Sequence, residues 1–167
     1  MRNTRYLIPD AKFNSGFTLL ELLVVITILG ILASVGLGQY RTSQLKARDI
    51  QRKGDLGNVA RALEMYYNDY SSYPPSTSGG LVDVDGGLDW GTEFSTSDVI
   101  YMKMLPKDPL QDKDANYVYC YQTDSGGTYY QLYAKLQNEN DTEYKGPYTC
   151  AGGNNYTYGI ASSNQTP

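Results

Sequence analysis

The order of hydrophobic and polar residues separates an apolar N-terminal segment from a more polar remainder. Residues 17–38 form an apolar run that contains one charged side chain, Glu21. As a helix with a rise of 1.5 Å per residue, this run would be about 33 Å long, enough to cross a hydrocarbon layer of roughly 30 Å. The pattern therefore predicts a transmembrane helix over residues 17–38, and the short basic segment 1–16 before it is expected to be a leader.

The helix is expected to continue as an amphipathic segment over residues 39–72, with its last helical residue near Tyr70. Apolar side chains recur there at steps of three and four residues, which is the spacing of one helix face. This stripe consists of Leu45, Ile50, Leu56, Val59, Ala60, Leu63, Tyr66 or Tyr67, and Tyr70. Pro74 and Pro75 follow, and proline cannot continue a helix.

Charged residues occupy the other face of this amphipathic segment. They are Arg41, Lys46, Arg48, Asp49, Arg52, Lys53, Asp55, Arg61 and Glu64. We interpret them as a solvated helix face; pairing between subunits or contact with lipid head groups is the alternative.

Residues 73–167 predict a globular head. Residues 76–97 are rich in Ser, Thr, Gly and Asp and are expected to form a long surface loop, and residues 98–105 a short helix. Strands are predicted over residues 116–122, 128–136 and 155–161, and the face of the second strand that should lie on the helix stripe carries Tyr130, Leu132, Ala134 and Leu136. The predicted fold class is α+β, a long N-terminal helix packed against a small antiparallel sheet.

Composition excludes several classes of function. The chain has 167 residues, a formal net charge of −4 and no histidine, which removes His-dependent triads and His metal sites. No nucleophile–base pair or phosphate-binding loop is visible, so we expect no enzyme activity. An acidic chain is also a poor general binder of nucleic acid. Seventeen tyrosines are interpreted as filling a small sheet and its edges with their hydroxyls in water. A stacking surface for sugars or bases is the alternative, and the net acidity makes bases the poorer fit.

Cys120 and Cys150 are the only cysteines of the chain. Both follow the predicted membrane helix, in the half that should face outward, where a cysteine pair usually forms a disulfide. Two separate buried thiols are the alternative. A bridge closing about 30 residues would stabilise the fold by roughly 3–4 kcal/mol on the loop-entropy model.

The apolar run raises a question of charge, because a carboxylate at the position of Glu21 costs on the order of 2.5–3.5 kcal/mol or more in lipid. If the chain were cut just before Phe17, the free α-amino group of Phe17 would be a positively charged partner for this carboxylate. A basic leader, Gly16, Phe17, Glu21 four residues later and an apolar helix together resemble the type IV pilin class, which includes the pilins and the pseudopilins of type II secretion.

The resemblance implies cleavage after Gly16 by a prepilin peptidase at the cytoplasmic face, and methylation of the new N-terminus at Phe17. It implies that subunits assemble through their apolar helices into a helical homopolymer, with Glu21 paired to the amine of Phe17. The partners it implies are an inner-membrane assembly platform and motor, and the lipid membrane before assembly. The expected location is the inner membrane as a single-pass protein, then an extracellular or periplasmic filament.

Within this class, we first expect a structural subunit of a type IV pilus-like filament. The alternative is a major pseudopilin of a type II secretion system. A second alternative is a ligand-binding pilin, either an adhesin or a DNA-uptake subunit. DNA fits poorly, because residues 71–167 contain five basic and twelve acidic side chains.

Calcium is a possible cofactor, because major pseudopilins, which the chain resembles, bind this ion in a loop of the head. Calcium takes six to eight oxygen ligands. Acidic side chains cluster in three loops, and the second and third clusters are favoured over the first. The first is Asp83, Asp85 and Asp89; the favoured two are Asp108, Asp112 and Asp114, and Asn138, Asn140, Asp141 and Glu143.

Overall fold

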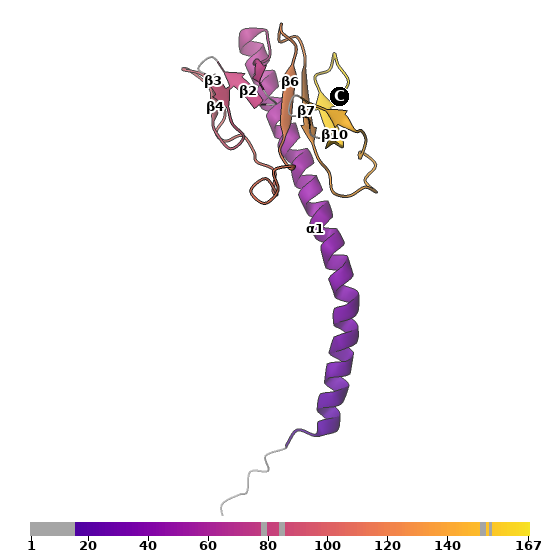
Figure 1. The fold of residues 1–167 in the computed structure, drawn as a ribbon. Helices are drawn as coiled ribbons and strands as arrows, with labels where there is room; N and C mark the ends of the chain where they lie inside the picture. The colour runs from indigo at the N-terminus through magenta and orange to yellow at the C-terminus, as the bar shows by residue number, and fades with distance from the viewer. Residues whose placement is uncertain (1–15, 78–79, 84–85, 151–152, 154) are drawn as a thin grey trace, which may run out of the picture. The chain divides into compact units, whose positions relative to one another are not determined.

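The computed structural model describes residues 16–77, 80–83, 86–150, 153 and 155–167 (Figure 1). One helix, α1 (Leu19–Tyr70), precedes the strands, so the predicted helix and its end at Tyr70 are confirmed. The described chain divides after residue 41 into two compact units, and α1 contributes to both. After α1, Ser71 adopts a left-handed backbone conformation with a φ of 56°, which stops the helical hydrogen bonding just before the two prolines.

The first strands of the head correct two expectations. β1 (Ser76–Thr77), β2 (Gly80–Asp83) and β3 (Gly86–Leu88) form an antiparallel sheet, and β4 (Phe94–Ser95) forms a ladder with β5 (Ile100–Met102). The prediction of an irregular loop over residues 76–97 is therefore wrong, and so is the helix over 98–105. Tyr101 of β5 is buried against Tyr66 of α1, with ring centroids 5.3 Å apart, and the extended backbone places it there.

The central sheet has the strand order β10-β7-β6 and is antiparallel throughout. It contains β6 (Cys120–Thr123), β7 (Tyr130–Ala134) and β10 (Tyr158–Ala161), and a separate ladder joins β8 (Tyr148–Thr149) to β9 (Asn155–Tyr156). The first two predicted strands are present as β6, which begins later and ends one residue further on, and as a shorter β7. The third prediction, residues 155–161, is divided between β9 and β10, which belong to different ladders. At the β6–β7 turn Gly127 has a φ of 62°, and a Cβ there would lie 2.6 Å from the carbonyl oxygen of Tyr73.

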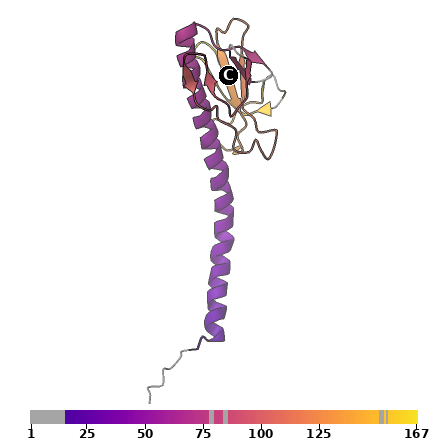
Figure 2. The same cartoon turned by 90° about the vertical axis from the view of Figure 1, so that its left-hand side faces the viewer.

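The core of the second unit lies between the later half of α1 and the central sheet. Figures 1 and 2 show the sheet on one side of this part of the helix. The aliphatic members of the core from the helix and the sheet are Leu56, Val59, Ala62, Leu63, Leu132 and Ala134. Many tyrosines fill it as expected, but the hydroxyls of Tyr101, Tyr119 and Tyr121 bind protein oxygens instead of being left to water. The buried tyrosines of this core are Tyr66, Tyr73, Tyr101, Tyr119, Tyr121 and Tyr130. Ile50 is different, because 71% of its surface is exposed, so its assignment to the buried stripe is wrong.

A buried ionic network contradicts the interpretation of the charged helix face as solvated for Asp49 and Arg52. Other charged residues of that face are exposed as expected; they are Arg41, Lys46, Arg61 and Glu64. The guanidinium of Arg52 is fully buried and donates to both carboxylate oxygens of Asp108, from Nε at 2.6 Å and from Nη2 at 2.9 Å. Its Nη1 donates to Asp49 Oδ1 at 2.7 Å. Asp49 also accepts the backbone N–H groups of Gln137 and Asn138, so each buried charge has several hydrogen bonds.

Acidic side chains of α1 also accept tyrosine hydroxyls from the head. Tyr119 donates to Asp55 at 2.7 Å, and Tyr101 donates to Asp69 at 2.8 Å. Tyr73 donates to Glu64, and burial together with this carboxylate raises the pKa of Tyr73 to about 12. Since a phenol beside a carboxylate stays protonated, these contacts remain hydrogen bonds at neutral pH.

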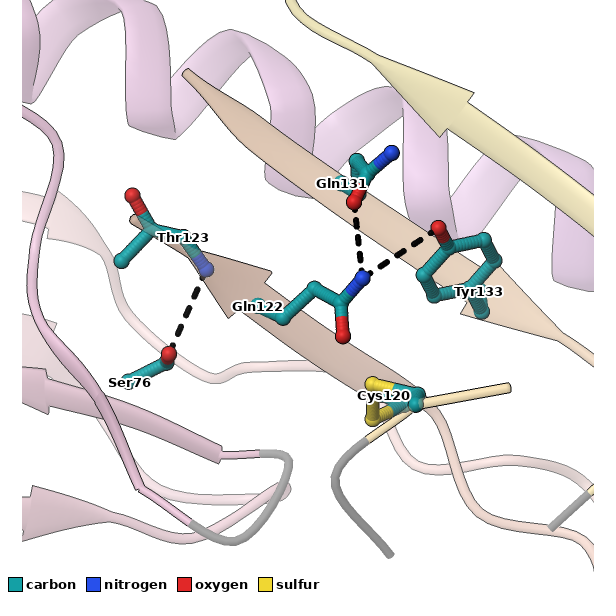
Figure 3. The surroundings of a disulfide bond; sticks show 7 residues. Ser76, Cys120, Gln122, Thr123, Gln131 and Tyr133 are labelled. Atoms are coloured by element: carbon teal, nitrogen blue, oxygen red, sulfur yellow. Dashed lines mark hydrogen bonds between the residues drawn. A yellow bond between two sulfur atoms is a disulfide. The ribbon is translucent and has the colours of Figure 1, made fainter. Parts of the chain in front are cut away.

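A disulfide joins Cys120 at the start of β6 to Cys150, with Cα atoms 6.4 Å apart (Figure 3). Beside it, the Gln122 side chain donates to Gln131 of the neighbouring strand at 2.7 Å. The bridge packs with Tyr133 and Tyr156 in a small second cluster. It therefore ties the central sheet to the segment that follows β8.

We expect Arg52→Met to reduce the free energy of unfolding by about 3–5 kcal/mol, because it leaves two buried carboxylates without their cation. The matched control is Arg48→Met, which removes one half-buried hydrogen bond to the Gln137 side chain and should cost about 1 kcal/mol. Denaturant unfolding of the full chain in detergent micelles measures both. Equal losses for the two variants would contradict the importance of the buried network.

We expect Cys120→Ala combined with Cys150→Ala to lower the free energy of unfolding by about 3–4 kcal/mol, since the denatured chain loses a loop constraint across 30 residues. Chemical reduction of the disulfide in the wild-type chain should lower the free energy of unfolding by a similar amount. The same reducing agent should not change the free energy of unfolding of the double variant. The same denaturant titration provides the measurement. A double variant as stable as the oxidised wild type would show that the bridge contributes nothing.

Candidate functional site

The N-terminal motif forms the beginning of α1. Gly16, Phe17 and Thr18 precede the helix, and residues 1–15 of the expected leader lie outside the described residues. The hydroxyl of Thr18 accepts the backbone N–H of Glu21 at 3.2 Å, and Glu21 Oε2 accepts the backbone N–H of Thr18 at 3.0 Å. This reciprocal arrangement is a capping box, which satisfies two of the otherwise unpaired donors at a helix start.

Glu21 therefore has a local role that the sequence prediction missed. The signal was available, because Thr18 and Glu21 have the Thr-x-x-Glu spacing of a capping box. The carboxylate also accepts the hydroxyl of Thr18 at 2.8 Å. Any role of Glu21 in assembly has to be separated from this role in starting the helix.

Beyond the cap, α1 carries a long apolar surface. Large hydrophobic side chains between Phe17 and Leu32 are exposed by 44% to 81%. Within the described residues α1 is a helix long and apolar enough to cross a membrane. Such a surface needs lipid or other apolar helices around it, since its exposure to water is unfavourable by roughly 25 cal/mol per Å².

In the part of the chain that the structure describes, the acidic side chains of the two favoured clusters either bind other protein groups or are exposed. There, no three His, Cys, Asp or Glu side chains are placed together as a group that could hold a metal ion. Asp108 is bound to Arg52 through both carboxylate oxygens, while Asp112 and Asp114 are exposed. In the second cluster, Asn140 is exposed and Asn138 donates its backbone N–H to Asp49.

The remaining acidic residues of the second cluster have a cation from the protein itself. Lys53 Nζ lies 2.6 Å from Asp141 Oδ1 and 2.7 Å from Glu143 Oε2. The hydrogen bond from Lys53 is the main cause that holds the pKa of Asp141 below its usual value. Sequence reasoning placed Lys53 on a solvated face and missed this contact, because nothing in the order of residues links positions 53 and 141.

Comparison with known proteins supports the resemblance. The family model described as the prokaryotic N-terminal methylation motif matches residues 12–37. The chain is 38% identical over 97 residues to the type II secretion system core protein G of Pseudomonas aeruginosa, an alignment covering 57% of this chain and 67% of that protein.

Two further relatives agree with this match. The type II secretion system core protein G of Aeromonas hydrophila is 39% identical over 95 residues, covering 57% of this chain and 66% of the relative. That of Klebsiella pneumoniae is 36% identical over 96 residues, covering 56% and 67%. The alignments thus span about two thirds of each relative, and no solved structure matches the chain.

The methylation motif, the apolar helix that follows it, the α+β fold and these relatives agree with one another. The chain belongs to the family of type IV pilins and type II secretion pseudopilins.

Proposed function

We propose that the chain is a major pseudopilin, a structural subunit of a type II secretion system. The observation that carries the proposal is its similarity to type II secretion system core protein G from several bacteria. These relatives favour the pseudopilin alternative over the pilus subunit that the sequence analysis expected first. Both assignments share the coarser role, a processed subunit that assembles into a filament.

The proposed life cycle follows from the N-terminal motif. The precursor is anchored in the inner membrane by the apolar part of α1 and is cut after Gly16 by a prepilin peptidase. The processed chain then enters a periplasmic filament, in which the exposed apolar surface of one subunit packs on that of others. An assembly platform and motor in the membrane would extract each subunit from lipid.

Glu21 is proposed to pair with the new amine of Phe17 during assembly. In an apolar environment, an isolated carboxylate or ammonium is strongly unfavourable, and each stabilises the other when they are close. The pair would set the register between neighbouring subunits. The capping box with Thr18 suggests how to test this charge separately from the helix start.

We expect Glu21→Gln to abolish filament assembly, because glutamine can keep the capping box but carries no charge. Thr18→Val is the matched control: it removes the cap hydroxyl and leaves the Glu21 charge, so filaments should still form. Electron microscopy of sheared or overproduced filaments provides the measurement, and mass spectrometry should show that the products of all three chains begin at Phe17. Normal filaments from Glu21→Gln would assign Glu21 to helix capping alone.

Deletion of the gene in the native organism should reduce the proteins secreted into the culture medium and cause them to accumulate in the periplasm. Surface fibres should be unchanged, because the proposed filament is periplasmic. Complementation with the wild-type gene should restore secretion, and Gly16→Val, which should not be cleaved, should fail to do so. Loss of surface fibres with normal secretion would instead establish the pilus assignment.

A further inference from the structure

The loop between β7 and β8 (residues 135–147) is held against the second half of α1 by side chains of the helix. Asp49 accepts the backbone N–H groups of Gln137 and Asn138, at distances from 2.8 to 3.1 Å. One turn further along the helix, Lys53 binds both Asp141 and Glu143. The helix thus fixes the loop at two points four residues apart, the first through a carboxylate and the second through an ammonium group.

The second point has the geometry expected of a cation site. Asp141 Oδ1 accepts Lys53 Nζ at 2.6 Å and also the backbone N–H of Glu143 at 2.9 Å, which bends the loop so that both carboxylates face the same ammonium group. The side chains of Lys53 and Asp141 are only 20% and 21% exposed. The side chain of Glu143 is 55% exposed and lies on the solvent side of the lysine. The ring of Tyr158 lies 5.5 Å from the Lys53 nitrogen and adds a further favourable contact for a cation.

This arrangement leaves no role for a calcium ion at the loop. Calcium requires six to eight oxygens around one point, but the two loop carboxylates already bind the lysine. A divalent ion at that position would have to displace the ammonium group or lie beside it against charge repulsion. The loop backbone is fixed by hydrogen bonds of its own. The backbone N–H of Tyr144 donates to the carbonyl of Asp141, and the backbone N–H of Lys145 donates to the carbonyl of Thr157.

We infer that Lys53 is the resident cation of this loop, taking the place that a bound calcium ion is expected to have, so that the head of this chain is stable without calcium. The inference concerns the folded head alone and is independent of whether the filament serves secretion or forms a pilus. Its test therefore uses purified protein and no secretion assay.

The melting temperature of the full chain in detergent micelles should be the same in 1 mM calcium chloride as in EGTA at matched ionic strength. Lys53→Met should lower it by about 2–4 °C in both buffers, the size expected when a partly exposed ion-pairing group is lost from a chain of this length. Lys46→Met, which changes an exposed lysine of the same helix, is the matched control and should have no such effect. Glu143→Gln provides a milder test and should lower the melting temperature by a smaller amount.

Two results would overturn the inference. One is a rise of several degrees in the melting temperature of the wild-type chain when calcium replaces EGTA, since the head would then depend on the ion. The other is a Lys53→Met chain that melts together with the Lys46→Met control. If Lys53→Met does not fold, the wild-type comparison between the two buffers and the Glu143→Gln variant still decide the question.

Discussion

The attachment of the head depends on a guanidinium group that is completely removed from water. Arg52 has no exposed surface, and burying an unpaired cation of this kind would cost many kilocalories per mole. Its partners come from two places, Asp49 on the same helix and Asp108 from the head. Because a bidentate Arg–Asp contact requires defined distances and angles, the network fixes the position of the head along the helix in a way that the aliphatic core alone does not.

The same principle extends along the second half of α1. Its acidic residues accept tyrosine hydroxyls from the head, and Lys53 binds the β7–β8 loop. Apolar contacts supply most of the favourable free energy of burial, but they allow sliding by small amounts. Hydrogen bonds to specific acids spaced along this half of the helix do not allow such sliding, because an unsatisfied buried group is costly. The polar contacts therefore determine which of several similar apolar packings is adopted.

The sequence predicted the features that have a strong local signal. The helix to Tyr70 has a long three-and-four periodicity, and the hairpin of β6 and β7 has alternating residues around a glycine turn. The short strands of residues 76–102 contain two to four residues each, which is too few for a periodicity to appear, and they are fixed by contacts such as that of Tyr101 with Tyr66. Their prediction would have required knowing the surface on which they pack.

The buried charges were missed for a different reason. Asp49 and Arg52 continue the steps of three and four residues that lead through Leu56 and Val59 to Leu63, so they lie on the buried stripe. Hydrophobicity alone assigns the apolar Ile50 to that stripe and the charged Arg52 to the opposite face. Helical phase was the better guide than hydrophobicity here, since the partner that makes the burial of Arg52 favourable lies 56 residues away, at Asp108.

The role of Glu21 does not follow from helical phase, because one carboxylate has both a local role in capping the helix and a proposed role in pairing with another subunit. In the described chain it caps the helix with Thr18, and a negative charge there is also favoured by the helix dipole. Proteolysis after Gly16 would place a positive charge one residue before Thr18, at a helix end that already disfavours cations. In an apolar surrounding that ammonium group needs a carboxylate, from its own chain or from a neighbour. A neighbour's Glu21 can supply it only when two apolar helices are staggered appropriately, so under the proposed pairing the cost of the new charge itself drives subunits into register.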